Sequence, residues 1–234
     1  MREPLTIAVA QPRCKAYDVA ANAYAHAEAV RAVRARVVVF PELSLTGYEL
    51  DAPPVDADDP RLAPIVAACA EAGSLALVGA PVPGDAGRPQ IGVLAIDGDG
   101  ARVAYRKMWL GGAEPEHFAP GDTPAVVEVA GWRLGLAVCK DTGVPRHAAD
   151  TAALGIDAYV AGALDSAAEW GVQDERARRI AAAHGVWVAI ASFAGSTGGG
   201  YADAAGRSRI WDPAGRVVAE AGPEPGAAVR ATLT

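Results

Sequence analysis

The sequence of 234 residues predicts an α/β protein built as a four-layer α/β/β/α sandwich, in which two mixed β-sheets pack face to face. Two observations predict this fold. Short apolar runs alternate with amphipathic segments along the whole chain. The order strand, helix, strand, helix, strand, hairpin then occurs twice, although the two halves share no evident sequence similarity. Each half therefore supplies one sheet, and its helices cover the outer face of that sheet.

The first half begins with a buried strand and ends with a hairpin. Leu5–Gln11 is apolar and stops at Pro12, and the β-branched run Arg36–Phe40 stops at Pro41, so both predict buried strands. Val19–Arg34 predicts a helix because its Ala and Val residues share one face. The other predicted elements are a helix capped by Asp59-Pro60 that runs to about Ala72, a strand at Leu75–Ala80, and a hairpin of Ile91–Ile96 and Ala101–Arg106 around the turn Asp97–Gly100.

The second half repeats this order. Its predicted strands are Ala125–Val129, Trp132–Cys139, Ala158–Ala161, Val186–Ala191, Ser208–Trp211 and Val217–Ala221, and its helices are roughly Pro145–Leu154 and Ala168–His184. Asp212–Gly215 predicts the turn between the last two strands. The acidic, proline-rich segment 50–60 is short and ends in a helix cap, so we expect no linker and a single domain over residues 1–234.

The composition limits the classes of function. The formal net charge is −7 and no block of Lys and Arg stands out, which argues against nucleic-acid binding and against an anionic membrane surface. The cysteines Cys14, Cys69 and Cys139 are odd in number and widely spaced, which favours a reducing compartment over a disulfide framework. The first residues lack the apolar stretch of a signal peptide and no later run could span a bilayer, so we expect a cytoplasmic protein.

The first candidate site residue is Glu42, which follows Pro41 at the end of a predicted strand. A loop glutamate is usually solvated, but Phe40 and Leu43 place apolar groups on both sides of this one. A carboxyl group among apolar neighbours has a raised pKa, which suits a general base.

A second candidate is Lys107, which follows Arg106 at the end of the predicted hairpin. Alternation along a strand sends these two side chains to opposite faces, so one of them points inward. Taken alone, the pair is better explained as positive charge that protects an edge strand.

The third candidate is Cys139, at the end of an apolar run and about five residues before a predicted helix. A lone cysteine is usually buried and inert. Here Lys140, Asp141 and Gly143 follow at once, and a plain core position rarely opens onto such a polar turn. A thiol on a sharp turn from strand to helix is exposed to substrate, and its thiolate is favoured by the helix N-terminus and by nearby cations.

Four segments in this order resemble the motifs of the nitrilase superfamily of carbon–nitrogen hydrolases, and the resemblance covers nearly the whole chain. They are FPELSLTGY with Glu42, YRK with Lys107, EPEHFAPGD with Glu114, and CKDTGVP with Cys139. Glu116 is the second choice for the third of these positions. The segments AIASFAGSTGGG and GRSRIWDPAGRVVAEAG also resemble the closing part of the family's sequences. The family fold is the same four-layer sandwich.

The sequence departs from the family pattern at several positions. Trp109 stands where the family usually has histidine, Lys140 replaces an aromatic residue, and Ser192 replaces a common asparagine. Val144-Pro145-Arg146 stands where Phe-Pro-Glu is usual. These changes leave the four chemical positions intact, and because several of them lie near the expected pocket, they bear on the substrate.

The resemblance implies a role for each of the four residues. Cys139 attacks the substrate carbonyl carbon, Glu42 is the general base and then the acid, and Lys107 stabilises the oxyanion. Glu114 positions Lys107 or the substrate. No cofactor is expected, and the four histidines, His26, His117, His147 and His184, lack the spacing of a metal site.

The predicted function is hydrolysis of a small, linear, non-peptide amide through a cysteine thioester. The alternatives are a nitrilase that acts on a C≡N bond, an acyltransferase, and a non-catalytic member of the fold that binds a small metabolite.

The residues expected to bind substrate are Trp109, Lys140, Asp165 and Trp170, although Asp165 is equally well explained as a helix cap. GSTGGG at 195–200 lacks the lysine of a phosphate-binding loop, so we expect a flexible loop near the pocket. Family members usually form dimers, so a homodimer or a higher oligomer is expected.

Overall fold

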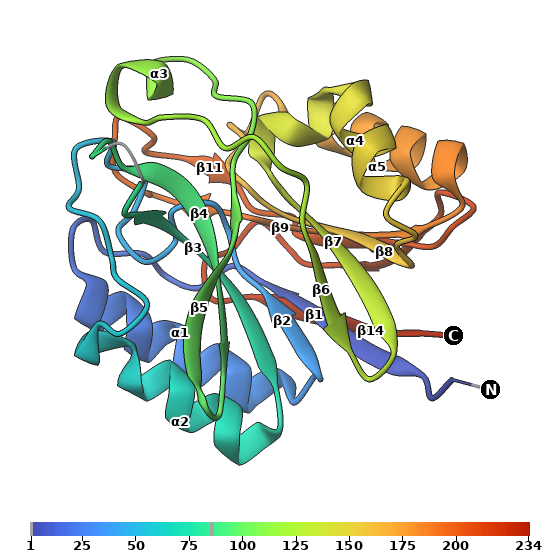
Figure 1. Cartoon of the computed structure of the whole chain (residues 1–234), viewed down its shortest axis with the longest axis horizontal. Helices are drawn as coiled ribbons and strands as arrows, with labels where there is room; N and C mark the ends of the chain where they lie inside the picture. Colours follow the sequence, from blue (N-terminus) through green and yellow to red (C-terminus); the bar gives the residue numbers. More distant parts are fainter. Residues whose placement is uncertain (1, 85–86) are drawn as a thin grey trace.

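Two six-stranded β-sheets form the middle layers of the computed structural model, and helices cover their outer faces (Figure 1). The structure describes residues 2–84 and 87–234. The first sheet has the order β14 (Ala228–Leu233), β1 (Leu5–Ala10), β2 (Val37–Val39), β3 (Leu75–Val82), β4 (Gln90–Asp97), β5 (Gly100–Arg106). The second has the order β13 (Val217–Glu220), β12 (Arg209–Trp211), β9 (Trp187–Ser192), β8 (Ala158–Ala163), β7 (Trp132–Val138), β6 (Val126–Val129). A small ribbon pairs β10 (Ala194–Gly195) with β11 (Ala204–Ala205).

The helices divide between the two outer layers. In Figure 1, α1 (Val19–Val33) and α2 (Ala63–Ala72) lie below the first sheet, and α4 (Pro145–Ala152) and α5 (Trp170–His184) lie above the second. The one-turn helix α3 (Glu114–His117) and the 3-10 turns η1 (Pro60–Leu62) and η2 (Cys139–Gly143) complete the helical elements of the described residues. The largest apolar cluster lies between the two sheets, and two further clusters lie under the helix pairs. The predicted four-layer sandwich is confirmed.

Both sheets combine parallel and antiparallel pairs. Three central strands run parallel in each sheet, β1–β2–β3 in the first and β7–β8–β9 in the second. Antiparallel strands flank them: β14, β4 and β5 in the first sheet, and β6, β12 and β13 in the second. The repeated order of elements in the sequence therefore corresponds to two sheets of similar topology.

Strand β14 is the main element that the sequence analysis missed. It pairs antiparallel with β1 along its whole length and is largely half-exposed. Its sequence, AVRATL, has a weak apolar pattern, so its stability depends on pairing with a distant strand rather than on local preference. Because β14 lies against β1, both ends of the chain lie at the same side of the molecule (Figure 1).

The turn that carries Glu42 lies between the two sheets, and two glycines make room for it. A Cβ atom on Gly162 of β8 would lie 2.5 Å from the carbonyl oxygen of Phe40 and 2.8 Å from the amide nitrogen of Glu42. A Cβ on Gly79 of β3 would press in the same way on the backbone of Pro41 and Leu43. One glycine from each sheet therefore fixes the depth at which Glu42 enters the core.

This close approach gives a first testable prediction. Gly162→Ala should lower the free energy of unfolding by about 2–4 kcal/mol, because backbone atoms cannot move aside as a flexible side chain can. Urea denaturation measures the change. Gly171→Ala in α5 is the control, since a Cβ there would meet no atom within 4 Å outside its own helix and chain neighbours, and it should keep or slightly raise the stability of the wild type. Equal stability of both variants would show that the turn is not held in this way.

Candidate active site

A buried lysine stands between two buried carboxylates. Nζ of Lys107 lies 2.6 Å from Oε1 of Glu42 and 2.8 Å from each carboxylate oxygen of Glu114. Lys107 is 0% exposed, Glu42 1% and Glu114 2%. Lys107 directly follows β5, Glu42 lies on the turn after β2, and Glu114 is the first residue of α3. Charged groups so deeply buried are stable only when paired.

Glu114 is fixed by further donors. Tyr48 Oη donates to Glu114 Oε1 at 2.7 Å, and the Gly111 amide donates to Oε2 at 2.7 Å. Glu116, the second choice for this position, is exposed. Tyr48 was not among the predicted site residues, since nothing in the pattern of its own segment distinguishes it from a core tyrosine.

Cys139 lies where β7 gives way to η2. The strand ends at Val138, one residue earlier than predicted, because Cys139 takes a left-handed conformation with φ of 42°. Few residues other than glycine adopt this conformation, and it marks a sharp turn from strand to helix. As a whole residue Cys139 is half-buried, and its sulfur lies 3.6 Å from the Leu164 carbonyl oxygen.

Asp141 holds this turn to the segment that carries the lysine. Its Oδ2 accepts hydrogen bonds from the Val138 amide at 2.9 Å and from Tyr105 Oη at 2.8 Å. Its Oδ1 accepts one from the Trp109 amide, two residues after Lys107, at 2.9 Å. One fully buried carboxyl group therefore ties together two loops that are distant in the sequence. The sequence analysis noted Asp141 only as part of a motif.

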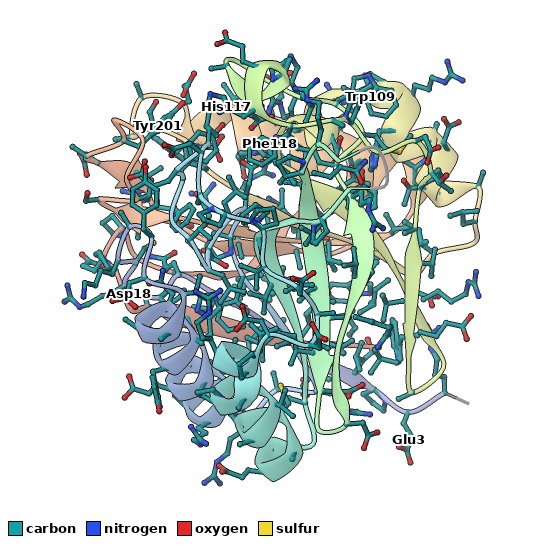
Figure 2. The ribbon with its side chains drawn as sticks, turned by 60° about the vertical axis from the view of Figure 1, so that its left-hand side comes forward. Glu3, Asp18, Trp109, His117, Phe118 and Tyr201 are labelled. Carbon is teal, nitrogen blue, oxygen red and sulfur yellow. The ribbon has the colours of Figure 1, made fainter. Side chains whose placement is uncertain are left out.

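A cavity opens at Cys139, and Trp109 is not among the residues that line it, contrary to the expectation that it binds substrate. Its ring stands edge-on to His147, with 5.7 Å between centroids. The ring nitrogens of His147 lie 2.9 Å from Tyr105 Oη and 2.8 Å from Tyr159 Oη. Trp109 thus belongs to the packing behind the cysteine turn. In Figure 2 it lies apart from Tyr201, a cavity residue, with the end of α3 between them in this view.

A cavity of about 450 Å³ opens at the cysteine. It is lined by Lys107, Glu114 and Cys139 together with Tyr48, Lys140, Asp165, Glu169, Arg176 and Tyr201, among others. Of the predicted substrate-binding residues, Lys140 and Asp165 are thus at the cavity. Gly199 also lines it, so the segment 195–200 lies beside the site as expected.

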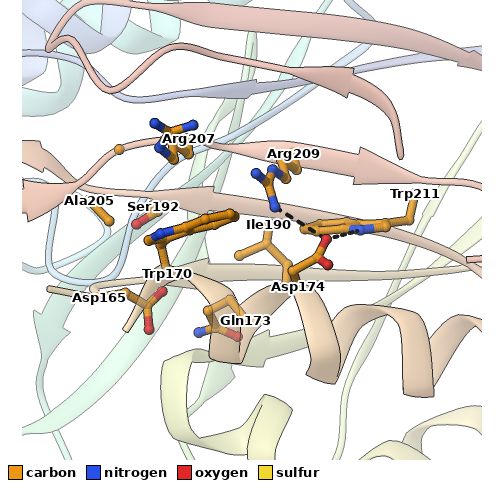
Figure 3. Close-up of a pocket in the computed structure, with 11 residues that line it drawn as sticks. Asp165, Trp170, Gln173, Asp174, Ile190, Ser192, Ala205, Arg207, Arg209 and Trp211 are labelled. Atoms are coloured by element: carbon orange, nitrogen blue, oxygen red, sulfur yellow. Dashed lines mark hydrogen bonds and ion pairs between the residues drawn. The ribbon is translucent and has the colours of Figure 1, made fainter. Parts of the chain in front are cut away.

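Trp170 lies in a neighbouring hollow rather than in this cavity. The guanidinium carbons of Arg207 and Arg209 lie 5.2 and 4.8 Å from the centre of its ring (Figure 3). Asp165 borders both spaces. The sequence suggested that Trp170 is near the pocket, and it is adjacent, but its ring is engaged by the two arginines.

Burial and charge set the protonation states of the site. Burial raises the pKa of Glu42 to about 7, although the positive charge of Lys107 acts to lower it. Burial alone would lower the pKa of Lys107, but the charges of Glu42, Cys139 and Glu114 outweigh it, so this pKa is raised and the side chain remains an ammonium. Burial, reinforced by the charge of Glu42, raises the pKa of Cys139 well above its ordinary value.

Cys139 is therefore a thiol in the resting protein. Lys107 does favour the thiolate, as expected from the sequence, but burial and the charge of Glu42 have the larger effect. A thiol of this kind needs a base beside it at the moment of attack. Glu42 is the carboxyl group whose charge raises the pKa of this thiol.

Over residues 2–84 and 87–234, no three His, Cys, Asp or Glu side chains are grouped as metal ligands would be. Within the same ranges, every helix is too short or too polar to cross a membrane.

Comparisons with known proteins agree with this geometry. The family model for carbon–nitrogen hydrolases matches residues 6–233. The protein named "Hydrolase in pqqF 5'region" of Pseudomonas protegens is 31% identical over 201 residues, which is 81% of this chain and 70% of that protein.

Solved structures show the same fold. A CN-hydrolase superfamily protein of Xanthomonas campestris superposes with a TM-score of 0.88 at 22% identity, covering 99% of this chain and 91% of that one. Nit3 of Saccharomyces cerevisiae gives 0.87 at 22% identity over 99% and 90% of the two chains. An amidase of Nesterenkonia gives 0.87 at 25% identity over 98% and 90%.

The fold and the family match define a hydrolase that acts on carbon–nitrogen bonds. The chain belongs to the carbon–nitrogen hydrolase family, the nitrilase superfamily that its motifs resemble.

Proposed function

We propose that this protein hydrolyses a small, linear, non-peptide amide through a thioester on Cys139. One observation carries the proposal: Lys107, Glu114 and Cys139 line one cavity, and the buried carboxyl group of Glu42 pairs with Lys107 at 2.6 Å and interacts with Cys139. The Nesterenkonia amidase supports the choice of an amide, because it has been solved with butyramide and with acrylamide added at its active-site cysteine.

In the first half of the reaction, the Cys139 thiol gives its proton to Glu42 as the sulfur attacks the carbonyl carbon. Negative charge moves to the carbonyl oxygen, where Lys107 Nζ and the Lys140 amide act as donors. Each such donor is typically worth about 3 kcal/mol. Glu42 then protonates the nitrogen, the C–N bond breaks, and ammonia or an amine leaves.

In the second half, a water molecule gives a proton to Glu42 and attacks the thioester carbon. The C–S bond breaks, the proton returns from Glu42 to the sulfur, and a carboxylic acid is released. Glu42 thus alternates between base and acid, for which a pKa raised to about 7 is well suited.

Glu114 is proposed to keep Lys107 in place rather than to exchange protons. Its carboxylate accepts hydrogen bonds from Lys107, Tyr48 and Gly111, and these bonds fix its orientation. With Glu114 holding the ammonium from one side, Glu42 can lose and regain a proton without releasing the lysine.

The same residues would attack a nitrile, and hydrolysis of either substrate ends in a carboxylic acid and ammonia, so the substrate that is turned over distinguishes the two reactions. We further propose that residues 1–234 act as one catalytic unit, that the protein forms a homodimer or a higher oligomer, and that it works in the cytoplasm. There its free cysteines Cys14, Cys69 and Cys139 would stay reduced.

Cys139→Ala tests the assignment of the nucleophile. Release of ammonia from a panel of small amides should fall by about 1,000-fold or more, because no other group can form the thioester. Intact mass of quenched wild-type protein should show an acyl adduct that the variant lacks. Cys69→Ala on α2 is the control and should keep the activity. Undiminished ammonia release by Cys139→Ala would refute the mechanism, and turnover of nitriles alone would favour the nitrilase alternative.

The pH profile tests Glu42 as the base. Because only the ionised carboxylate accepts a proton and its pKa is raised to about 7, kcat/KM for an uncharged amide should rise with pH through this region. The measurement is a series of initial rates from pH 5.5 to 8.5. A rate that is level across this range, or that falls as pH rises, would exclude Glu42 from this role.

A further inference from the structure

Two cationic side chains on the cavity have no partner among the described residues. Lys140 and Arg176 both line the cavity, and neither forms an ion pair or a side-chain hydrogen bond with the part of the chain that the structure describes. Lys107, by contrast, is satisfied by its two carboxylates. Within residues 2–84 and 87–234, the cavity therefore contains two cationic groups without an ion-pair partner.

The two side chains reach the cavity from different elements. Arg176 lies on the face of α5 that also presents Glu169 and Val172, at helical spacing. Its guanidinium packs over Gly143, where a Cβ would lie 2.9 Å from Cζ. Lys140 follows the nucleophile, and its stem lies over Gly111, where a Cβ would lie 3.2 Å from Cδ. Arg176 thus lies against the cysteine turn, and Lys140 extends from that turn to Gly111.

Neighbouring arginines differ from this pair. Arg207 and Arg209 stack on the ring of Trp170, and Arg209 also pairs with Asp174 and Glu220 at 3.2 and 2.8 Å (Figure 3). Their charges are already engaged. Arg176 has no such arrangement.

Besides Glu114, which holds Lys107, two acidic residues line the same cavity, and neither forms an ion pair with Lys140 or Arg176. Glu169 accepts a hydrogen bond from Ser166 Oγ at 2.7 Å. Burial raises the pKa of Asp165 to about 7, so its negative charge is reduced near neutral pH. Arg176 lowers this pKa in part, yet no ion pair forms between them. An external anion can therefore use the guanidinium.

We infer that the substrate carries a carboxylate a few bonds from the C–N bond that is cleaved, and that Arg176 and Lys140 bind it. The planar guanidinium suits a carboxylate, since it can donate two parallel hydrogen bonds. The inference rests on the proposed amidase function. The carboxylate belongs either to the acyl part of the substrate or to the leaving amine, and the experiment separates these sources.

The test compares matched substrates. Succinamate and glutaramate carry the anion on the acyl side, and N-acetyl-β-alanine carries it on the amine side. Butyramide, valeramide and N-propylacetamide are the uncharged counterparts, and 4-aminobutanamide is the cationic one. We expect kcat/KM to be higher by about tenfold or more for one anionic class than for its neutral counterpart.

The variants identify the residues. Arg176→Gln should reduce this preference by about tenfold, mainly through KM, and Arg176→Lys should restore part of it. Lys140→Gln should reduce it less, because Lys140 is exposed. Arg146→Gln is the control: it removes the same charge from an exposed surface pair with Asp150 and should leave the preference unchanged. Preference for neutral or cationic amides, or an anionic preference that survives both Arg176→Gln and Lys140→Gln, would overturn the inference.

A binding experiment separates this inference from the proposed function. Calorimetry with succinate and the Cys139→Ala variant needs no turnover. Binding of succinate that Arg176→Gln weakens about tenfold supports the anion site, even if no amide is hydrolysed. Failure of succinate to bind, in a protein that does hydrolyse amides, would reject the anion site and leave the hydrolase proposal standing.

Discussion

The pairing of one buried ammonium with two buried carboxylates is the constraint on which the site depends. Lys107, Glu42 and Glu114 are almost fully removed from solvent, and each alone would be costly to keep charged there. Lys107 pairs with both carboxylates at distances of 2.6 to 2.8 Å, whereas Oε2 of Glu42 has no hydrogen-bond partner among the described residues. The three residues come from three separate segments of the chain. The first half of the protein must therefore be assembled before these charges can be buried at low cost.

The fold supplies this arrangement through close backbone contacts rather than through bulky side chains. Gly79 and Gly162, one from each sheet, admit the turn that carries Glu42. The left-handed conformation of Cys139 turns the thiol out of the sheet and toward the cavity. Asp141 then fixes the cysteine turn to the segment after Lys107. Strained or tightly constrained positions gather where the chemistry is expected, which is common at functional sites.

Local patterns predicted the strands and helices well, and the ends of strands indicated where reactive residues lie. Glu42, Lys107 and Cys139 each lie just past the end of a strand, and the family resemblance related them to one another. Local patterns could not show contacts between distant segments. This is why β14, the Tyr48 contact with Glu114 and the bonds of Asp141 were missed. Trp109 was expected to bind substrate because of its place in a motif, but its ring stands against His147 and it does not line the cavity.

The most direct measurement of the central claim is the coupling between Lys107 and its carboxylate partner in the free energy of unfolding. At pH 8, Lys107→Met should destabilise the protein by about 3–5 kcal/mol, because it leaves carboxylates buried without their cation. The double variant Lys107→Met, Glu42→Gln should recover part of this loss, because one of the unpaired charges is gone. A single variant within about 1 kcal/mol of the wild type, with no recovery in the double variant, would contradict the account.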